Sequence, residues 1–317
     1  MSVYTPVSES QLASWLGAYS VGRLESCEPI QAGIENTNYF VTTSQGRYVL
    51  TLFERLPAEE LPFYVNLMAH LARHGIPCPA PIADLSDQYL QRLNGKPAVL
   101  VTRLAGASVE RPGGAECAEL GALLARMHLA ARSYAAYLEN PRGPKWWRFA
   151  AREVASFLDS AQRARLESEL AFQAEHRFPD LPRGPVHADL FRDNALFAQG
   201  RISGVVDFYF AGVDTFLYDV AVCANDWCLR DPAGGLELDE SRTVALLSAY
   251  HALRPFGADE RAAWPVLLRA AALRFWLSRL HDFHLPRPGV MVHAHDPGHF
   301  GEILELRVGA AAAPWID

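Results

Sequence analysis

Acidic and amide side chains recur at short spacing in one segment of the chain, which is the part best suited to chemistry. Residues 194–197 and 202–208 read as two strands joined by a Gln-Gly turn. Because Asn194 and Asp207 stand at nearly equal distances from that turn, they should lie almost opposite each other at the open end of the hairpin. Asp189 lies on the loop before the first strand and should face the same space. Carboxylate and amide oxygens suit Mg²⁺, so the pattern predicts a magnesium site beside a second carboxylate.

A carboxylate beside a bound cation can accept the proton of an attacking hydroxyl group. The order His187-x-Asp189-x-x-x-x-Asn194, followed by Asp207-Phe208, matches the loop and metal motif of protein-kinase-type phosphoryl transfer. We therefore predict a kinase that uses ATP and Mg²⁺.

Structural roles are the alternative for each of these residues. In the structural alternative, Asp189 caps a turn and Asp207 ends a strand, both of which are common uses of aspartate. We interpret His187 as a buried residue that braces the loop through a hydrogen bond, and Asp193 as a solvated or loop-bracing carboxylate.

The elements around this segment predict a two-lobed α+β fold. Alternating short apolar and polar runs, with an Asn-Gly turn between the last two, predict five antiparallel strands. A helical spacing of apolar residues predicts one helix packed on this sheet, from residue 57 to residue 74. The strands are expected near 22–31, 37–43, 47–54, 88–93 and 98–104.

Helical periodicity dominates the rest of the chain, so we place a domain boundary after residue 104. Residues 1–104 are predicted to form a β-rich nucleotide-binding lobe, and residues 105–317 a helical lobe for catalysis and substrate binding. The nucleotide is expected between them. Helical segments are expected around 117–132, 145–176, 214–229, 240–254 and 259–284.

Composition and charge indicate which binding partners and which cellular compartment to expect. The formal net charge is −7 and no block rich in Lys or Arg occurs, which argues against nucleic acid. No apolar run approaches the roughly 20 residues needed to cross a bilayer. The first residues lack a basic segment followed by an apolar one, so we expect a cytoplasmic protein whose five scattered cysteines are reduced.

Over nearly its whole length the chain resembles the aminoglycoside phosphotransferase and choline kinase group of protein-kinase-like enzymes. Within that group it is most similar to the homoserine kinases. This resemblance implies ATP-dependent phosphorylation of the L-homoserine hydroxyl group, in threonine biosynthesis. It is carried by the stretches GIENTNYFV, YVLTLFE, EELPFYVNLMAHLARHGIPCPAPI, HADLFRDNALF, DFYFAGVDTFLYDVAVCANDWC and LRFWLSRLHD.

The resemblance also implies a role for each matching residue. Asp189 would be the catalytic base, Asn194 and Asp207 the magnesium ligands, and Asp219 the carboxylate that braces the catalytic loop. A loop near the N-terminus would cover the nucleotide phosphates, and the backbone of a later strand would meet adenine. The residues implied for these two contacts are Gly33, Ile34, Asn36 and Asn38 for phosphate, and Leu100, Thr102 and Arg103 for adenine.

One departure from the family pattern concerns the phosphates. Kinases of this type place a Lys on the third strand, aligned here with Thr51, and pair it with a Glu that should fall near Tyr64. Lys96 and Lys145 are the only lysines, and both lie elsewhere. The absence of both partners leaves no unpaired buried charge. Magnesium, backbone N–H groups or an arginine must then meet the phosphate charge.

The proposed substrate is a zwitterion and needs a cation for its carboxylate and an acceptor for its ammonium group. We expect Arg274 or Arg279 to bind the carboxylate, Asp226 or Asp282 to bind the ammonium, and Trp227 to form a wall. The alternative for each arginine is a surface or intrahelical ion pair.

Other functions stay open at this point. An aminoglycoside or choline kinase of the same fold is the nearest rival, and its cationic substrates would need no arginine. A nucleotide-binding module without activity is the rival from another class, although retention of Asp189, Asn194 and Asp207 argues against it. His293, His295 and His299 invite a zinc site, but without cysteines at ligand spacing we interpret them as an exposed loop.

Overall fold

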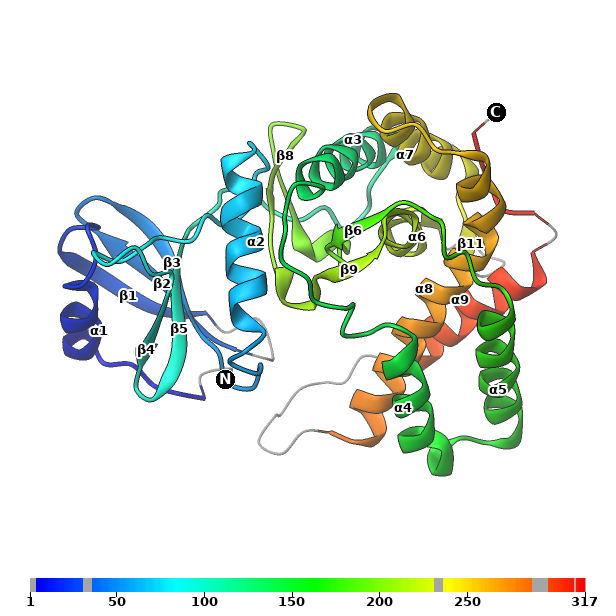
Figure 1. Cartoon of the computed structure of the whole chain (residues 1–317), viewed down its shortest axis with the longest axis horizontal. Helices are drawn as coiled ribbons and strands as arrows, with labels where there is room; N and C mark the ends of the chain where they lie inside the picture. Colours follow the sequence, from blue (N-terminus) through cyan, green and yellow to red (C-terminus); the bar gives the residue numbers. More distant parts are fainter. Residues whose placement is uncertain (1–3, 31–35, 231–235, 287–295, 311, 317) are drawn as a thin grey trace. The chain divides into compact units, whose positions relative to one another are not determined.

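The computed structural model describes residues 4–30, 36–230, 236–286, 296–310 and 312–316. These residues form two compact units, one that ends at Gly106 and one that begins at Ala107 (Figure 1). The sequence prediction placed this division after residue 104. Each unit is described by itself below.

The first unit contains a five-stranded antiparallel sheet, as predicted. Its order, β1-β2-β3-β5-β4, places β3 and β5 inside the sheet and β1 and β4 at its edges. Asn94 and Gly95 both have positive φ angles, 48° and 80°, which is the geometry that favours this pair in a tight hairpin. The strands are β1 (Leu24–Ile30), β2 (Thr37–Thr43), β3 (Gly46–Leu52), β4 (Leu90–Leu93) and β5 (Lys96–Thr102).

Two helices accompany this sheet, whereas one was predicted. Helix α2 (Leu61–Arg73) is the expected one. Helix α1 (Glu9–Leu16) was missed, although Ser8 and Gln11 form a capping box at its start. It is only eight residues long and buries only Leu12 and Leu16, so its apolar pattern is short.

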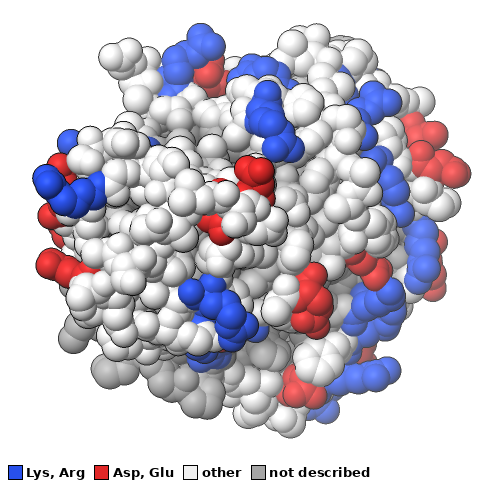
Figure 2. Space-filling model, turned by 60° about the vertical axis from the view of Figure 1, so that its left-hand side comes forward, with Lys and Arg blue, Asp and Glu red and all other residues white. Residues whose placement is uncertain are grey.

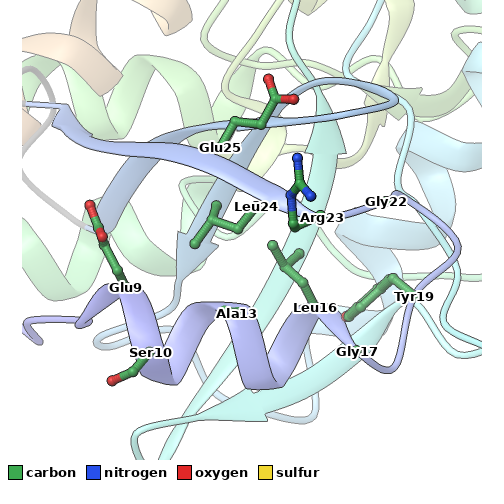
Figure 3. A pocket seen from close by; sticks show the side chains of 10 residues that line it. All are labelled: Glu9, Ser10, Ala13, Leu16, Gly17, Tyr19, Gly22, Arg23, Leu24 and Glu25. Atoms are coloured by element: carbon green, nitrogen blue, oxygen red, sulfur yellow. The ribbon is translucent and has the colours of Figure 1, made fainter.

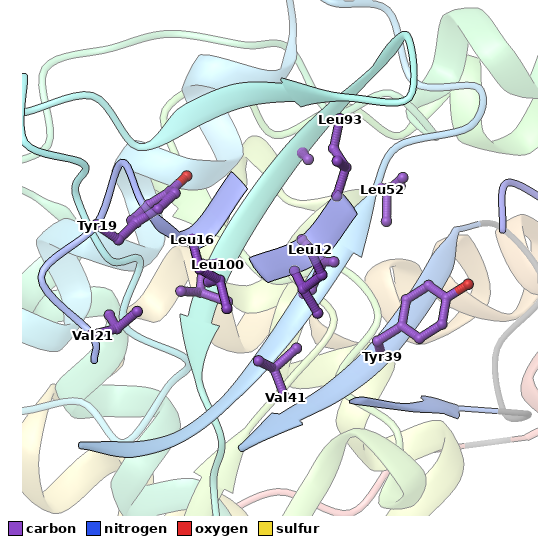
Figure 4. Packing of buried hydrophobic residues seen from close by; sticks show 11 residues of the cluster. Leu12, Leu16, Tyr19, Val21, Tyr39, Val41, Leu52, Leu93 and Leu100 are labelled. Carbon is purple, nitrogen blue, oxygen red and sulfur yellow. The ribbon is translucent and has the colours of Figure 1, made fainter. Parts of the chain in front are cut away.

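Helix α1 covers one face of the sheet. Leu12 and Leu16 are almost fully buried in a cluster with aliphatic and aromatic side chains of the strands (Figure 4). Alternate residues of each strand supply this face, because successive side chains point to opposite sides of a sheet. The sheet residues of the cluster are Tyr39, Val41, Leu50, Leu52, Leu93, Ala98 and Leu100.

A hollow of about 680 Å³ lies between α1 and the start of β1 (Figure 3). Glu9 on the helix and Arg23 and Glu25 near the strand contribute its charged side chains. None of the predicted site residues lines it.

The second unit is mainly helical, and its catalytic segment lies on two small antiparallel sheets. Strand β6 (Arg183–Val186) pairs with β9 (Gly212–Thr215), and β7 (Ala195–Ala198) pairs with β8 (Arg201–Val205). The helices are α3 (Gly114–Ala131), α4 (Pro144–Val154), α5 (Ser160–Glu175), α6 (Phe216–Trp227), α7 (Glu240–Leu253), α8 (Ala258–His284) and α9 (Pro297–Gly309).

Two helical features differ from the predictions. The segment 145–176 forms two helices, because Leu158 is extended and Asp159 caps the start of α5. Helix α9 begins at Pro297 with Asp296 as its cap, where an exposed loop was expected. His299 therefore lies on a helix, while His293 and His295 fall outside the described residues.

Among the helices that the structure describes, none combines the length and apolar character needed to span a membrane. Basic and acidic side chains are mixed over the face drawn in Figure 2.

Helices α3 and α7 pack closely at Gly121. A methyl group added there would lie 2.1 Å from the backbone oxygen of Leu246, so neither helix can keep its place around a larger residue. We expect Gly121→Ala to lower the free energy of unfolding by about 1 to 3 kcal/mol, the usual cost of overpacking. Urea titration of the variant and the wild type measures this difference in unfolding free energy.

Gly114→Ala is the matched control on the same helix. Its added methyl group would find its nearest neighbour, the Ala245 side chain, at 3.9 Å, which is an ordinary contact. Equal unfolding free energies for the two variants would contradict the close packing at Gly121.

Candidate active site

The loop that follows β6 carries Asp189, and hydrogen bonds to Asp219 hold this loop in place. The Asp219 carboxylate on α6 accepts the N–H of His187 at 2.9 Å and the N–H of Ala188 at 2.7 Å. Ala188 has a positive φ angle of 62°, which is uncommon for a residue with a side chain. Two hydrogen bonds to one carboxylate therefore hold the residue before Asp189 in an unusual conformation.

His128 on α3 supports Asp219 in turn. Its Nε2 lies 3.0 Å from Asp219 and its Nδ1 lies 2.7 Å from the hydroxyl group of Tyr250 on α7. Burial raises the pKa of Asp219, but the hydrogen bonds from His128 and the His187 N–H outweigh burial, so this pKa lies below its ordinary value. Because Asp219 is charged, the Nε2 of His128 must donate.

His187 has the bracing role predicted from the sequence. Its Nε2 donates to the backbone oxygen of Val206 at 2.9 Å, which ties the Asp189 loop to the end of β8. The ring is buried, and burial lowers its pKa. His187 is thus a structural partner of the hairpin.

Asn194 and Asp207 both lie at the open end of the β7–β8 hairpin, close to the predicted register. The N–H of Val206 donates to the backbone oxygen of Asn194 at 2.9 Å, so Asp207 is one residue beyond the position opposite Asn194. Asp207 is exposed and has a φ angle of 64°. It takes this left-handed conformation as the chain turns out of the hairpin.

Asp189 contacts one of the predicted metal ligands directly. The side-chain nitrogen of Asn194 donates to the backbone oxygen of Asp189 at 2.8 Å and lies 3.5 Å from its carboxylate. This orientation leaves the amide oxygen of Asn194 for a cation. An amide oxygen and the Asp207 carboxylate suit Mg²⁺, which takes the rest of its ligands from water and phosphate oxygens.

Arg274 is also a neighbour of Asp189. Its guanidinium nitrogen lies 3.4 Å from the Asp189 carboxylate, and only 4% of the arginine side chain is exposed. The guanidinium carbon also lies 3.7 Å from the ring centre of Phe275. The prediction that Arg274 binds substrate did not foresee this ion pair with the expected base.

The structure gives Asp226 a different partner from the predicted ammonium group. Its carboxylate accepts hydrogen bonds from the backbone N–H of Arg192 at 2.8 Å and from two guanidinium nitrogens of Arg192 at 3.1 Å. Arg192 lies between Asp189 and Asn194, so Asp226 braces the catalytic loop. The assignment of Asp226 to substrate is corrected accordingly.

The prediction that Trp227 forms a wall of the substrate site is wrong. Its side chain is fully buried, and its indole N–H donates to the backbone oxygen of Leu190 at 3.0 Å. Since Leu190 follows Asp189, Trp227 supports the loop from inside the core. An aromatic residue at the end of a helix gave no sequence signal that separates these two roles.

Three phenylalanines from distant parts of the chain form a cluster beside the loop, and sequence reasoning missed it. Phe191 lies 4.3 Å from Phe275 and 5.8 Å from Phe300, and the latter two lie 5.1 Å apart, all between ring centres. Arg279, the second predicted substrate arginine, has its guanidinium carbon 5.2 Å from the ring centre of Phe300.

The first unit contains the residues predicted to meet nucleotide phosphates. Gly33 and Ile34 lie outside the described residues. Asn36 is buried, and its side-chain oxygen has no hydrogen-bond partner within the described ranges. Asn38 accepts a 2.7 Å hydrogen bond from Thr51, the residue in the place of the missing lysine. A neutral threonine, paired with the neighbouring strand, therefore stands where the family pattern has its lysine.

The segment predicted to meet adenine is partly engaged within the first unit. The Leu100 oxygen accepts from Ile82 at 2.8 Å, the Thr102 N–H donates to Ala80 at 3.0 Å, and the Arg103 N–H donates to Arg47 at 3.1 Å. The two N–H groups are thus already paired, and the adenine contact of this segment stays a prediction.

The Arg103 side chain lies on the face of the sheet opposite to α1. Its guanidinium carbon is 3.8 Å from the ring centre of Phe40, which shares that face with Asn38.

Acidification should destabilise the protein in part through His128. Burial lowers its pKa from 6.5, so the unfolded chain binds a proton at a higher pH than the folded chain does. Its contribution to stability is complete above pH 6.5 and is lost as the pH falls below it, at up to about 1.4 kcal/mol per pH unit. In His128→Gln, unfolding free energies from urea titrations between about pH 7.5 and about pH 5 should fall less steeply than in the wild type.

A wild-type slope in His128→Gln would contradict the buried neutral histidine.

Known proteins resemble this chain in both sequence and fold. A model of the phosphotransferase enzyme family matches residues 26–256. A homoserine kinase of Burkholderia mallei (strain SAVP1) is 51% identical over 325 residues, which cover 99% of this chain and 98% of that protein.

Solved structures show the same fold at low sequence identity. An amicoumacin kinase in complex with AMP-PNP and Ca²⁺ has a TM-score of 0.70 and 17% identity, over 95% of this chain and 92% of that chain. A microcompartment-associated aminopropanol kinase has a TM-score of 0.63 and 18% identity, over 95% and 94%. The predicted protein-kinase-like α+β fold is confirmed. Because the family model spans more than half of the sequence, the chain belongs to the phosphotransferase enzyme family.

Proposed function

We propose that this protein is a homoserine kinase, which transfers the γ-phosphoryl group of ATP to the hydroxyl group of L-homoserine in threonine biosynthesis. The observation that carries the proposal is the 51% identity, over nearly the full length of both chains, with a protein named homoserine kinase. We place the activity in the cytoplasm.

Asp189 is the proposed catalytic base. The hydroxyl oxygen of homoserine forms a bond to the γ-phosphorus while the bond from that phosphorus to the β–γ bridging oxygen breaks. The hydroxyl proton passes to the Asp189 carboxylate, and ADP leaves with the bridging oxygen. The support for this role is the position of Asp189 beside Asn194, on a loop that Asp219 and His187 hold in place.

Asn194 and Asp207 would hold magnesium. When bound, the ion offsets the negative charge of the phosphates and orients them for transfer. The donor set fits, because the Asn194 nitrogen faces Asp189 and Asp207 is exposed at the same end of the hairpin. Water and phosphate oxygens would supply the remaining ligands.

The missing third-strand lysine has a neutral replacement in this proposal. Thr51 and Asn38 satisfy each other, and Tyr64, near the expected glutamate position, donates to Glu60 at 3.1 Å. Neither pair offers a positive charge to the nucleotide. The phosphate charge then falls mainly to magnesium.

Replacing the proposed base tests the mechanism. Asp189→Asn should lower kcat by about 100- to 10,000-fold, because the amide cannot accept the hydroxyl proton. Coupled ADP release with homoserine, choline and kanamycin as separate acceptors measures this and the acceptor class together. Homoserine should be the preferred acceptor of the wild type.

Asp193→Asn is the matched control, since Asp193 is an exposed acid on the same loop. It should keep kcat within a few-fold of the wild type. Wild-type turnover in Asp189→Asn would remove the general-base assignment, and preference for kanamycin or choline would remove the homoserine assignment.

Replacing the proposed metal ligand tests the cation. Asp207→Asn should shift the magnesium dependence of kcat to concentrations at least about tenfold higher, because a neutral amide binds Mg²⁺ more weakly than a carboxylate does. Initial rates over a magnesium titration at saturating substrates measure the shift. An unchanged magnesium dependence would place the ion elsewhere.

A further inference from the structure

Two arginines of α8 lie near the catalytic loop, and their surroundings differ. Arg274 is almost fully buried and already pairs with Asp189, with 3.4 Å between the guanidinium nitrogen and the carboxylate oxygen. It also contacts the faces of Phe275 and Phe210, with 3.7 Å and 5.2 Å from the guanidinium carbon to the ring centres. One nitrogen of Arg274 is thus committed to the proposed base.

Arg279 has no such commitment. Across the residues that the structure describes, it makes no hydrogen bond or ion pair. Its guanidinium carbon lies 5.2 Å from the ring centre of Phe300. It is partly buried. Burial and the positive charge of Arg274 lower its pKa, while the charges of Asp226, Asp189 and Asp193 oppose that shift. Those opposing charges mean that Arg279 lies within electrostatic range of the catalytic loop.

The nearby acids leave Arg279 available for an anion from outside. Asp226 is engaged by three nitrogens of Arg192, and Asp189 faces Arg274. A partly desolvated guanidinium group beside an active site, without a carboxylate of its own, is well suited to a substrate carboxylate.

The aromatic cluster joins Arg279 to the reacting groups. Phe300, on which Arg279 lies, contacts Phe191 at 5.8 Å, and Phe191 is two residues after Asp189. Packed rings have little freedom to move, so they hold the cation at a set place relative to the loop.

We propose that the two arginines have different roles: Arg279 binds the carboxylate of an amino-acid substrate, and Arg274 positions Asp189. This inference rests on the proposed homoserine kinase activity and assigns the residue that determines its substrate class. It predicts that Arg279 matters only when the acceptor carries a carboxylate, while Arg274 matters for every acceptor.

A pair of acceptors that differ only in the carboxylate tests this division. 3-Aminopropan-1-ol is homoserine without its carboxylate group. In Arg279→Gln, kcat/KM for homoserine should fall about 10- to 100-fold, the value of a lost charge-assisted hydrogen bond, and kcat/KM for 3-aminopropan-1-ol should stay within about twofold. In Arg274→Gln, kcat should fall by the same factor for both acceptors, with little change in KM.

Binding measurements keep the test decisive when turnover of the amino alcohol is slow. Inhibition constants against homoserine are measured for 3-aminopropan-1-ol and for L-2-aminobutyrate, which keeps the carboxylate but lacks the hydroxyl group. Arg279→Gln should weaken inhibition by L-2-aminobutyrate about 10- to 100-fold and leave inhibition by 3-aminopropan-1-ol unchanged.

Two further variants separate charge from structure. Arg279→Lys keeps the positive charge and should recover part of the homoserine activity. Arg269→Gln is the matched control on the same helix, because Arg269 pairs with Glu169 on α5 and should affect stability without changing the ratio of the two acceptors. Thermal unfolding of each variant confirms that it is folded.

The outcomes distinguish this inference from the function on which it rests. Equal losses for both acceptors in Arg279→Gln, with the wild type active on homoserine, would overturn the carboxylate role alone. A selective loss for homoserine in Arg274→Gln would reverse the two roles. A wild type that phosphorylates 3-aminopropan-1-ol but not homoserine would overturn the proposed function and the inference together.

Discussion

The buried charge of Asp219 is the constraint on which the rest of the active site depends. A carboxylate without solvent must be compensated by hydrogen bonds, and here the donors are the His187 and Ala188 N–H groups and the His128 ring. Two of these donors belong to the catalytic loop, so satisfying the charge also shapes the loop. The cost of the left-handed conformation at Ala188 is offset by the same bonds. The hydrogen bonds that compensate the charge of Asp219 therefore also fix the conformation of the loop.

Local signals account for what could be predicted from the sequence. An Asn-Gly pair with positive φ angles closes the β4–β5 hairpin, and Gln199 and Gly200 do the same for β7–β8. Turn chemistry and alternation depend on neighbouring residues, so the antiparallel strands and the two hairpins could be predicted from them. The long helices were evident for the same reason.

What could not be predicted depends on contacts between distant residues. The ion pair of Arg192 with Asp226, the burial of Trp227 and the ion pair of Arg274 with Asp189 all join positions more than 30 residues apart along the chain. Periodicity carries no information about such pairs. A second limit is length, since the eight residues of α1 bury too few side chains to produce a strong pattern. The short capping box at Ser8 was the signal that went unused.

The support of one loop by three helices has a consequence for how this family can vary. His128, Asp219 and Tyr250 come from α3, α6 and α7, so the relative placement of these helices is transmitted to the residue beside Asp189. A substitution far from any ligand can thus silence the enzyme while most of its structure persists. Divergence among relatives should then be slow at these buried positions, because each of them contributes to the shape of the catalytic loop.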